Sequence, residues 1–566
     1  MNGMRKYIAV ALSLAYAAAA MAIPARPGVR TVTQPDGSTI NIIVHGDEFF
    51  HYTTTEDGRL LQEDSDGFYR LATIADDGAI VATDIHPDAP EAADKALTAK
   101  DLKKVTARRN MRRQPTRASQ YNYGLVETNY PVMGSPRALV ILAEFKDVKF
   151  NKTEGYDPVD YHRDMINGDD FTQFGGTGSA RRYFIEQSHW QFSPRFDVLG
   201  PVTLPRNMAT YGANDRDGFD RNPHLMVIDA MDILDPTVDF SVYDTNGDGV
   251  IDNVYVFYAG LGEADFGGAN TIWPHSWDVQ EAGVTKKYDG KLLSHYACSN
   301  EWAKNKPEGV GTFIHEFSHV MGLPDLYNTV SSYAYYTPLE YSVLDLAPYN
   351  NDQRTPCNYS AFERNALGWA EPLVLREPCS VTLNDISQGG FALIPTGKNT
   401  EFFLLENRQQ TGWDTYIPNH GLLIWHIDYD KDVFEENEVN NVEKHQLVDL
   451  VEANGEAGYY FQKDYTFPGT TGKTSFTSET TPALKTWAGL KIDVPITNIT
   501  ETDGVITFDV KGGGEMFTPT AVKEIIDEED AEPEYYTMQG IRIAEPAPGT
   551  IVIERKGNSV RKLIFR

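Results

Sequence analysis

Cysteine is scarce in this chain of 566 residues, which contains three: Cys298, Cys357 and Cys379. An odd and low count excludes a small fold held together by a disulfide framework. At most one pair can form, and the sequence does not identify which. None of the three stands in a C-x-x-C arrangement. The chain must therefore hold its fold by burying apolar side chains, and its 41% hydrophobic content is ample for packed cores.

Positive charge is also in short supply, because 50 Lys and Arg residues face 81 Asp and Glu residues, a net charge of −31. Phosphate-rich partners are bound mainly by Lys and Arg, so this balance argues against nucleic acid and anionic membranes as partners. It suits a protein that binds cations such as calcium. We expect most of the carboxylates to lie on a solvated surface.

Long apolar runs are missing after the N-terminus. Residues 1–22 predict a secretory signal peptide, with Arg5 and Lys6 before an apolar stretch and an A-x-A cleavage site ending at Ala22. A membrane anchor is the alternative, but the run is short for a span. We therefore expect an exported protein, secreted or at the cell surface, with no transmembrane segment.

The length predicts more than one domain. We expect an α+β multidomain protein with a catalytic domain of mixed sheet and active-site helix, followed by a β-rich domain. The predicted parts are a propeptide-like domain, the catalytic domain, a β-rich accessory domain, an acidic linker and a short β tail. Their ranges, after the signal peptide, are 23–119, 120–370, 371–511, 512–534 and 535–566.

Short alternating runs and Asp-Gly turns predict strands in 23–119. The segment 107–117 is basic and polar, which is typical of a linker or of a protease-sensitive joint between a propeptide and an enzyme. In the catalytic region, 138–145 is a near-continuous apolar run that predicts a strand buried on both faces. Helices are predicted at 179–187 and 225–234.

The strongest motif is H-E-x-x-H, from His315 through Glu316 to His319. On a helix, two His residues four positions apart lie on one face and can share one metal ion. Glu316 can act as the general base of such a site. Apolar residues recur at three- and four-residue steps and predict a buried face distinct from the His face: Val310, Phe313, Ile314, Phe317, Val320 and Met321.

The residues after the motif predict a third metal ligand. Gly322 suits the left-handed turn that ends a helix, and Pro324 prevents the helix from continuing. The chain can then return and bring Asp325 to the metal. Glu340 lies far enough downstream to be the rival third ligand. Asp325 is preferred, because the glycine turn has little purpose in the rival scheme.

A second metal site is predicted at Asp244-Thr245-Asn246-Gly247-Asp248-Gly249-Val250-Ile251-Asp252. Oxygen-bearing side chains fall at the spacing of a calcium loop, and Val250 would offer its carbonyl. The expected calcium ligands are Asp244, Asn246, Asp248, Val250 and Asp252. The helix that follows an EF-hand loop is missing, and a plain surface turn is the alternative.

These motifs resemble the immune inhibitor A-like metalloproteases, a secreted bacterial family. The resemblance lies in the segment from His315 to Asp325, in 359–369, and in the β region at 406–409 and 421–428. It covers roughly 23–510 by motif position. It implies a propeptide, a metzincin-like catalytic domain that activates water with zinc, support by calcium, and an attached β domain. The tail at 535–566 is similar to secretion signals of a type IX-like bacterial route.

The sequence departs from the family at one position. Members usually carry Met in the turn beneath the zinc, and Leu344 stands there in this chain. Leu has a similar volume and no polar atom, so it can pack in the same place.

The resulting prediction is a secreted zinc endopeptidase that cleaves protein or peptide substrates. Zinc would be held by His315, His319 and Asp325, with Glu316 as general base. The alternatives are a calcium-stabilised surface binding protein on an inactive protease fold and a zinc hydrolase that is not a protease. The propeptide is the expected inhibitor. It contains no cysteine to bind zinc, so the stretch His45 to Glu48 is a candidate for blocking it, with an ordinary turn as the alternative.

Overall fold

The computed structural model describes most of the chain between Ile23 and Thr520 and four short segments after it. The described residues are 23–26, 28–47, 50–75, 80–90, 92, 96–98, 124–126, 128–216, 218–265, 267–303, 305–331, 335–520, 534–536, 542–543, 551–556 and 559–564. The predicted signal peptide at 1–22 and the basic segment at 107–117 lie outside them. The chain divides into unit 1, Met1–Pro519, and unit 2, Thr520–Arg566.

A mixed six-stranded sheet forms the centre of the predicted catalytic region, in the order β11-β14-β10-β7-β8 with β15 paired to β14. β7, β8, β10 and β14 are parallel neighbours, and β11 runs antiparallel to β14. The bounds are β7 Arg137–Glu144, β8 Arg195–Thr203, β10 Val254–Leu261, β11 His275–Asp278, β14 His295–Ala303 and β15 Lys306–Pro307. The mixed sheet expected for this region is present.

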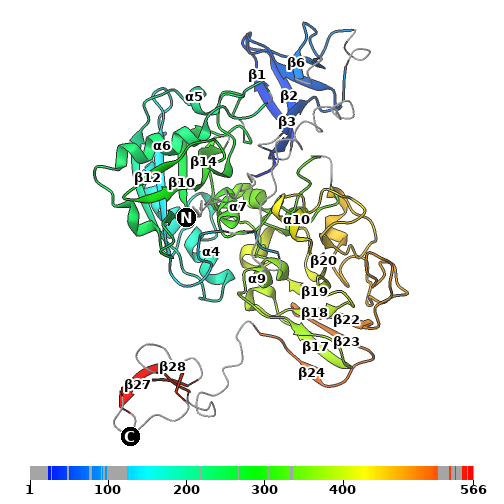
Figure 1. The fold of residues 1–566 in the computed structure, drawn as a ribbon. Helices are drawn as coiled ribbons and strands as arrows, with labels where there is room; N and C mark the ends of the chain where they lie inside the picture. Colours follow the sequence, from blue (N-terminus) through cyan, green and yellow to red (C-terminus); the bar gives the residue numbers. More distant parts are fainter. Residues whose placement is uncertain are drawn as a thin grey trace, which may run out of the picture. The chain divides into compact units, whose positions relative to one another are not determined.

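β7 is buried on both faces, as its apolar sequence predicts. Successive side chains of a strand point to opposite faces. Val140 and Leu142 accordingly join one apolar cluster and Leu139 and Ile141 another. Helix α7, Val310–Val320, packs in the first cluster, and Figure 1 places it beside this sheet. The sheet is thus the platform that carries the H-E-x-x-H helix.

Seven further α-helices are described, of which α6 and α3 are the longest. The predicted helices at 179–187 and 225–234 correspond to α4 and α6. The bounds are α3 Pro158–Asn167, α4 Ala180–Gln187, α5 Met208–Gly212, α6 Pro223–Leu234, α8 Asn350–Gln353, α9 Ala361–Ala366 and α10 Lys431–Glu435. A small sheet, β12-β13-β9, lies beside the predicted calcium loop, with bounds β9 Val250–Ile251, β12 Lys286–Tyr288 and β13 Lys291–Leu293.

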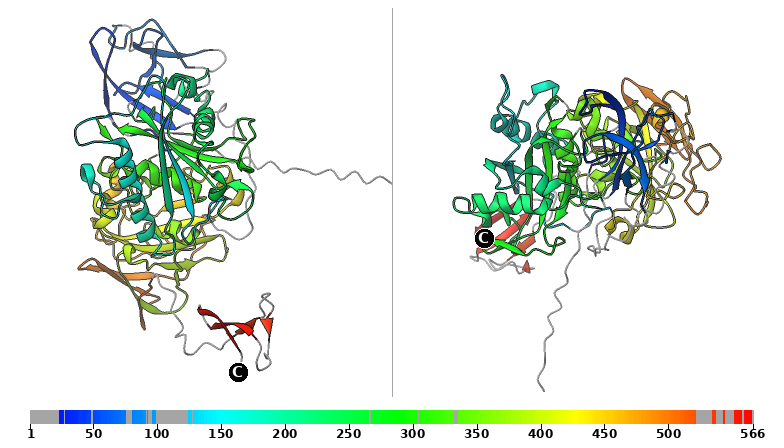
Figure 2. Two further views of the ribbon diagram at one scale, coloured as in Figure 1. Left: turned by 90° about the vertical axis from the view of Figure 1, so that its left-hand side faces the viewer. Right: turned by 90° about the horizontal axis from the view of Figure 1, so that it is seen from above.

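The N-terminal region is a six-stranded antiparallel sheet in chain order, β1 to β6. The bounds are β1 Arg30–Thr33, β2 Thr39–Asp47, β3 Phe50–Thr54, β4 Leu60–Glu63, β5 Tyr69–Ile74 and β6 Ile80–Ala82. It lies at one end of unit 1 in Figure 1 and in the left view of Figure 2. The expected β character of the propeptide-like region is therefore present.

The region after Glu371 is mostly β, as predicted, and its two sheets enclose an apolar cluster of their own. Their orders are β16-β18-β19-β20-β21 and β22-β23-β17-β24. The bounds are β16 Leu373–Val374, β17 Cys379–Leu383, β18 Ala392–Pro395, β19 Glu401–Arg408, β20 Gly421–Asp428, β21 Val448–Leu450, β22 Ile496–Thr502, β23 Val505–Val510 and β24 Met516–Phe517.

The predicted boundary near residue 371 stays a prediction. One apolar cluster contains Phe317 and Trp369 from before the boundary, and Trp425 and Tyr465 from after it. Helix α7 and the β-rich region therefore share a core. Unit 2 is a four-stranded antiparallel sheet in the order β26-β25-β27-β28. Its bounds are β25 Glu534–Tyr536, β26 Arg542–Ile543, β27 Ile551–Lys556 and β28 Ser559–Ile564.

The three cysteines are free and buried, so no pair forms among them. Across the part of the chain that the structure describes, no helix has the length and apolar character to cross a membrane.

Candidate active site

Helix α7 carries both His residues of the motif and is more enclosed than its sequence suggests. The apolar face predicted from the sequence packs into the apolar cluster that contains Val140 and Leu142. His315, Glu316 and His319 are buried as well, with 0%, 0% and 6% of their surface exposed. The whole helix is buried because other segments of the chain cover the His side. Burial of three polar side chains is costly unless each has a partner.

Gly322 turns the chain as predicted. Its φ is 92°, and a Cβ atom built there would lie 2.4 Å from the main-chain oxygen of Val126. Both the left-handed conformation and the close approach require glycine. The Leu323 amide donates to the Ser318 carbonyl at 3.0 Å, which closes the turn. The chain then returns toward α7 and presents Asp325.

His315, His319 and Asp325 form a triangle of potential ligand atoms. The Nε2 atoms of His315 and His319 are 3.1 Å apart. Oδ1 of Asp325 lies 3.4 Å from Nε2 of His315 and 3.2 Å from Nε2 of His319. Ligands about 2.0–2.2 Å from a tetrahedral zinc ion are about 3.3–3.6 Å apart. The triangle therefore fits one zinc ion.

The other ring nitrogen of each His is occupied. Nδ1 of His315 lies 2.6 Å from the Val343 carbonyl, and Nδ1 of His319 lies 2.7 Å from the Leu323 carbonyl. A carbonyl only accepts, so each Nδ1 must carry the hydrogen, and each Nε2 offers its lone pair. Apart from the two His contacts, Oδ1 of Asp325 has no hydrogen-bond partner. This is the donor set that a cation requires.

The charges of the triangle support the same conclusion. Burial alone would raise the pKa of Asp325, but His319 and His315 beside it hold that pKa well below its usual range. Burial lowers the pKa of His315, although Asp325 opposes this. The carboxylate is thus ionised and His315 favours its neutral form, as metal ligands must be.

Glu316 lies next to the triangle but is held differently. Its Oε1 accepts a hydrogen bond from the main-chain nitrogen of Ile23 at 3.1 Å, and its Oε2 is buried without a partner. His315, Glu316 and His319 have ligand atoms within 4.8 Å of one another. Burial, with the charge of Asp325, raises the pKa of Glu316 well above its ordinary value. Such a carboxylate readily takes up a proton.

Asn437, from the β-rich region, clamps Asp325. Its Nδ2 donates to Oδ2 of Asp325 at 2.7 Å, and its Oδ1 accepts from the Asp325 amide at 2.8 Å. Asn437 is fully buried and has a left-handed φ of 53°. The clamp occupies Oδ2 and leaves Oδ1 directed at the His pair. Partners of this kind fix the orientation of metal ligands.

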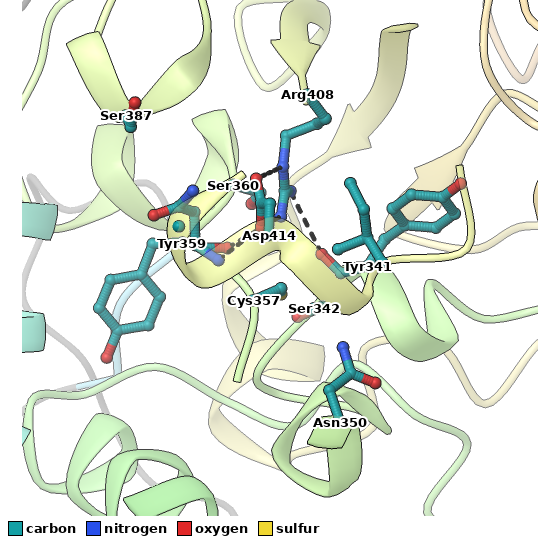
Figure 3. Close-up of polar contacts among 12 residues, drawn as sticks. Tyr341, Ser342, Asn350, Cys357, Tyr359, Ser360, Ser387, Arg408 and Asp414 are labelled. Carbon is teal, nitrogen blue, oxygen red and sulfur yellow. Dashed lines mark hydrogen bonds and ion pairs between the residues drawn. The ribbon is translucent and has the colours of Figure 1, made fainter. Parts of the chain in front are cut away.

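The turn beneath the triangle is braced by β19. Arg408 pairs with Asp414 at 2.6 Å and donates to the carbonyl of Tyr341 at 3.4 Å, as Figure 3 shows. Two residues after Tyr341, the carbonyl of Val343 accepts a hydrogen bond from Nδ1 of His315. The next residue, Leu344, is fully buried in the apolar cluster that contains Phe317. Leu344 therefore packs in the core, as expected for an apolar side chain of this volume.

Glu340, the rival third ligand, is placed elsewhere. Its Oε1 accepts a hydrogen bond from the Tyr459 hydroxyl at 3.1 Å, and burial raises its pKa. Oδ1 of Asp325, not a carboxylate oxygen of Glu340, lies beside both Nε2 atoms. The geometry therefore favours Asp325.

Residues 23–26 lie across the site. The Ile23 carbonyl accepts from Nε1 of Trp273 at 3.0 Å, the Pro24 carbonyl accepts from the Tyr349 hydroxyl at 2.5 Å, and the Arg26 amide donates to the carbonyl of Ala264 at 3.2 Å. The stretch predicted to block the zinc is only partly described: Nε2 of His45 pairs with Thr54 at 2.9 Å, and the side chains of 46–50 lie outside the described residues.

The predicted calcium loop is folded onto itself. Asp244 accepts from the amides of Gly247 and Gly249 at 2.8 and 3.1 Å, and Nζ of Lys291 lies 2.6 Å from its Oδ2. Gly249 makes the expected turn, with φ at 94°.

The other oxygens of the loop have similar local partners. Asn246 accepts from the Asp248 amide at 2.9 Å, Asp248 from the Val250 amide at 2.8 Å, and Asp252 from the Thr245 amide at 3.1 Å. Oδ1 of Asp252 is buried without a partner, and burial raises the pKa of this residue to about 6. The loop has the predicted spacing, and calcium there stays a prediction.

Three supporting residues were not identified from the sequence: Ile23, Asn437 and Arg408. Their partners lie 293, 112 and 67 residues away along the chain. Contacts so distant leave no local pattern, and Asn437 is one of many Asn residues in the chain.

Known proteins resemble the segment that contains this site. Residues 133–344 match the family described as immune inhibitor A peptidase M6, catalytic domain. Immune inhibitor A of Bacillus thuringiensis subsp. alesti is 28% identical over 233 residues, covering 34% of this chain and 33% of that protein. Pre-pro-metalloprotease PrtV of Vibrio cholerae serotype O1 is 27% identical over 229 residues, covering 34% of this chain and 25% of that protein.

The match thus spans about a third of the length of the first relative and about a quarter of the second. Among solved structures, metalloproteinase-II from Bacteroides fragilis is similar with a TM-score of 0.22 and 11% identity, covering 60% of this chain and 85% of that one. The sequence comparisons confirm the predicted resemblance to the immune inhibitor A peptidase family through residues 133–344. One of the two relatives, PrtV, is named as a metalloprotease.

Proposed function

We propose that this protein is a secreted zinc-dependent endopeptidase. The observation that carries the proposal is the triangle of His315 Nε2, His319 Nε2 and Asp325 Oδ1, with sides of 3.1–3.4 Å and Glu316 beside it. These three residues would hold the zinc ion. Zinc bound there would polarise the scissile carbonyl and lower the pKa of water.

The remaining chemistry belongs to side chains of this chain. Glu316 takes a proton from the attacking water and later gives it to the leaving amine, for which its raised pKa suits it. Val343 and Leu323 hold the two imidazoles in the tautomer that offers Nε2. Asn437 directs Oδ1 of Asp325 at the same point.

Hydrolysis of casein by the processed protein tests this proposal. A zinc chelator should abolish cleavage, and added zinc should restore it. His319→Ala should be inactive with or without zinc, while His420→Ala, which changes an exposed His paired with Glu501, should behave like the wild type. Chelator-resistant cleavage by the wild type would exclude the proposed mechanism. The inactive surface binding protein gains no support, since both His residues, Asp325 and Glu316 are in place.

The N-terminal region serves as the inhibitor in this proposal. The predicted signal cleavage after Ala22 would make Ile23 the first residue, and its nitrogen lies on Glu316. A free α-amino group is a cation at neutral pH and would pair with this carboxylate. Glu316 would then be unable to accept a proton from water until cleavage in 107–117 releases the N-terminal region.

Adding the isolated propeptide back to active enzyme tests this part. A propeptide that begins at Ile23 should inhibit casein hydrolysis. The same propeptide with one extra Gly before Ile23 should inhibit much less, because its amino group can no longer lie on Glu316. Equal inhibition by both would show that the position of the amino group is not important.

A further inference from the structure

We propose that the acidic pocket around Arg26 is a substrate subsite that selects Arg or Lys at the fourth residue after the cleaved bond. Its walls are Asp265, Asp352 and Tyr349, all in the predicted catalytic region. This inference rests on the proposed endopeptidase function and adds a substrate class to it.

The segment 23–26 is bound as the C-terminal product of a cleavage would be. Hydrolysis produces a C-terminal peptide whose new amino group lies beside the proposed base, Glu316, at the moment of cleavage. The nitrogen of Ile23 occupies a corresponding position, 3.1 Å from Oε1 of Glu316. Ile23 therefore corresponds to the first residue of that product and Arg26 to the fourth. The carbonyls of Ile23 and Pro24 and the amide of Arg26 make the other polar contacts. These are main-chain groups, so a substrate of another sequence can bind in the same way.

Arg26 is enclosed by groups that suit a cation. Nη1 lies 3.5 Å from Oδ1 of Asp265, Nη2 contacts Oδ1 of Asp352, and the guanidinium lies 5.9 Å from the centre of the Tyr349 ring. The side chains of Arg26 and Asp265 are 16% and 2% exposed. A planar cation between two carboxylates and an aromatic ring has both ion pairing and cation–π attraction.

The backbone that forms one wall is strained. Asn351, Asp352 and Gln353 have successive left-handed φ values of 48°, 59° and 71°. Such conformations are unfavourable for residues other than glycine and tend to occur at functional sites. Here the turn places Asp352 on Arg26 and directs Nε2 of Gln353 to Oδ2 of Asp265 at 3.2 Å.

Release of the propeptide leaves Asp265 without a cation among the described residues. The positive charges that act on it are Arg26 and Arg30, and both leave with the propeptide. Lys306 forms its ion pair with Asp352 and not with Asp265. The guanidinium of Arg354 donates to main-chain carbonyls of Asp352 and Pro307. A buried carboxylate favours a new cationic partner, and the fourth residue of a bound substrate can supply it.

Peptide substrates that differ at one position test the pocket. Fluorogenic peptides with a known cleavage site carry Arg, Lys, Ala or Glu as the fourth residue after the bond. The processed wild type should cleave the Arg peptide with a kcat/KM about 10- to 100-fold above that of the Ala peptide, with Lys between them and Glu lowest. An Arg to Ala ratio near one would mean that the pocket serves only to anchor the propeptide, and would overturn the inference.

A product-inhibition measurement gives an independent check on the wild type alone. The peptide Ile-Pro-Ala-Arg, which is residues 23–26, should inhibit with a Ki at least about 10-fold lower than that of Ile-Pro-Ala-Ala. Equal Ki values would contradict the role of the pocket.

Variants locate the selection in this pocket. Asp265→Asn should bring the Arg to Ala ratio toward one, and Asp352→Asn, at a carboxylate that is 44% exposed, should lower it with little risk to folding. Glu479→Gln removes an exposed carboxylate that pairs with Lys491 and should keep the wild-type ratio. An unchanged ratio in both pocket variants would overturn the inference.

The outcome also separates this inference from the proposed function. Casein hydrolysis is measured beside every peptide assay. If the wild type cleaves neither casein nor any peptide, the endopeptidase proposal fails. If it cleaves casein and shows no basic preference at the fourth residue, only the subsite is wrong.

Discussion

Two segments of this protein have the sequence of a metal site, and their polar atoms are arranged in opposite ways. At the proposed zinc site, neighbouring groups bind Nδ1 of both His residues and Oδ2 of Asp325. The two Nε2 atoms of the His pair and Oδ1 of Asp325 face one another. At the acidic loop, Asp244 is already engaged by two amides and by Lys291. Both segments have a ligand spacing typical of a metal site. The first keeps all three proposed ligand atoms for a cation, whereas Oδ1 of Asp252 is the buried oxygen of the acidic loop that has no partner.

The comparison teaches that a prepared metal site needs partners for the atoms that do not bind the metal. At the catalytic centre these partners come from Leu323, Val343 and Asn437, two of them distant in sequence. At the acidic loop the partners occupy most of the side-chain ligand oxygens themselves. We therefore expect tight binding at the first site and weak binding at the second.

The largest expected effect concerns Glu316, the proposed base on helix α7. Glu316→Gln should lower kcat on casein by about 10²–10⁴-fold, because the variant cannot accept the proton from water. Initial rates of the processed variant measure this. Asp345→Asn alters another buried carboxylate near the site, whose pKa burial raises to about 7, and serves as the comparison for non-specific disturbance. Wild-type rates in Glu316→Gln would exclude it as the base.

A smaller effect is expected from the clamp on Asp325. Asn437→Ala should weaken zinc binding by about 10- to 100-fold, since a released carboxylate no longer points at the His pair. Competition with a chromogenic chelator measures the affinity. Asn441→Ala is the matched control, because Asn441 binds Thr329 of the same loop and not a ligand. Equal affinity in the wild type and Asn437→Ala would show that the clamp has no effect on the metal.

The acidic loop at 244–252 should bind calcium better once Lys291, the cation that pairs with Asp244, is removed. In Lys291→Ala, calcium should raise the melting temperature by about 2–4 °C more than in the wild type, because Asp244 becomes available and binding stabilises the folded state. Lys287→Ala, at an exposed position nearby, is the control. If calcium changes neither melting temperature, the loop is a surface turn and the calcium prediction is wrong.

The smallest effect is expected at the turn beneath the triangle of His315, His319 and Asp325. Leu344→Met should change stability by less than about 1.5 kcal/mol and activity little, since the two side chains have similar volumes and Leu344 already packs in the main core. Denaturant unfolding and casein hydrolysis measure both quantities. A large gain in activity would mean that the sulfur has a role that packing does not explain.

The sequence was informative where the pattern is local. Helical spacing, the glycine turn and the short return of the chain are enough to predict that His315, His319 and Asp325 come together. The apolar run at 138–145 predicts a strand buried on both faces for the same reason. These features depend on residues within a few turns of one another.

The rest of the site depends on contacts that no local pattern encodes. Asn437 reaches Asp325 across 112 residues, and Ile23 reaches Glu316 across 293. The full burial of α7 has the same origin, since distant segments cover its His face. The acidic loop shows the converse: its spacing was predicted, but the pairing of Lys291 with Asp244, 47 residues apart, was not.

Zinc content after dialysis tests the central claim most directly. The wild type and Glu316→Gln should each retain one zinc ion per chain by elemental analysis. Asp325→Ala, with the same overall fold by circular dichroism, should lose it under the same conditions. Loss of zinc from Glu316→Gln together with its full retention in Asp325→Ala would contradict the ligand set proposed here.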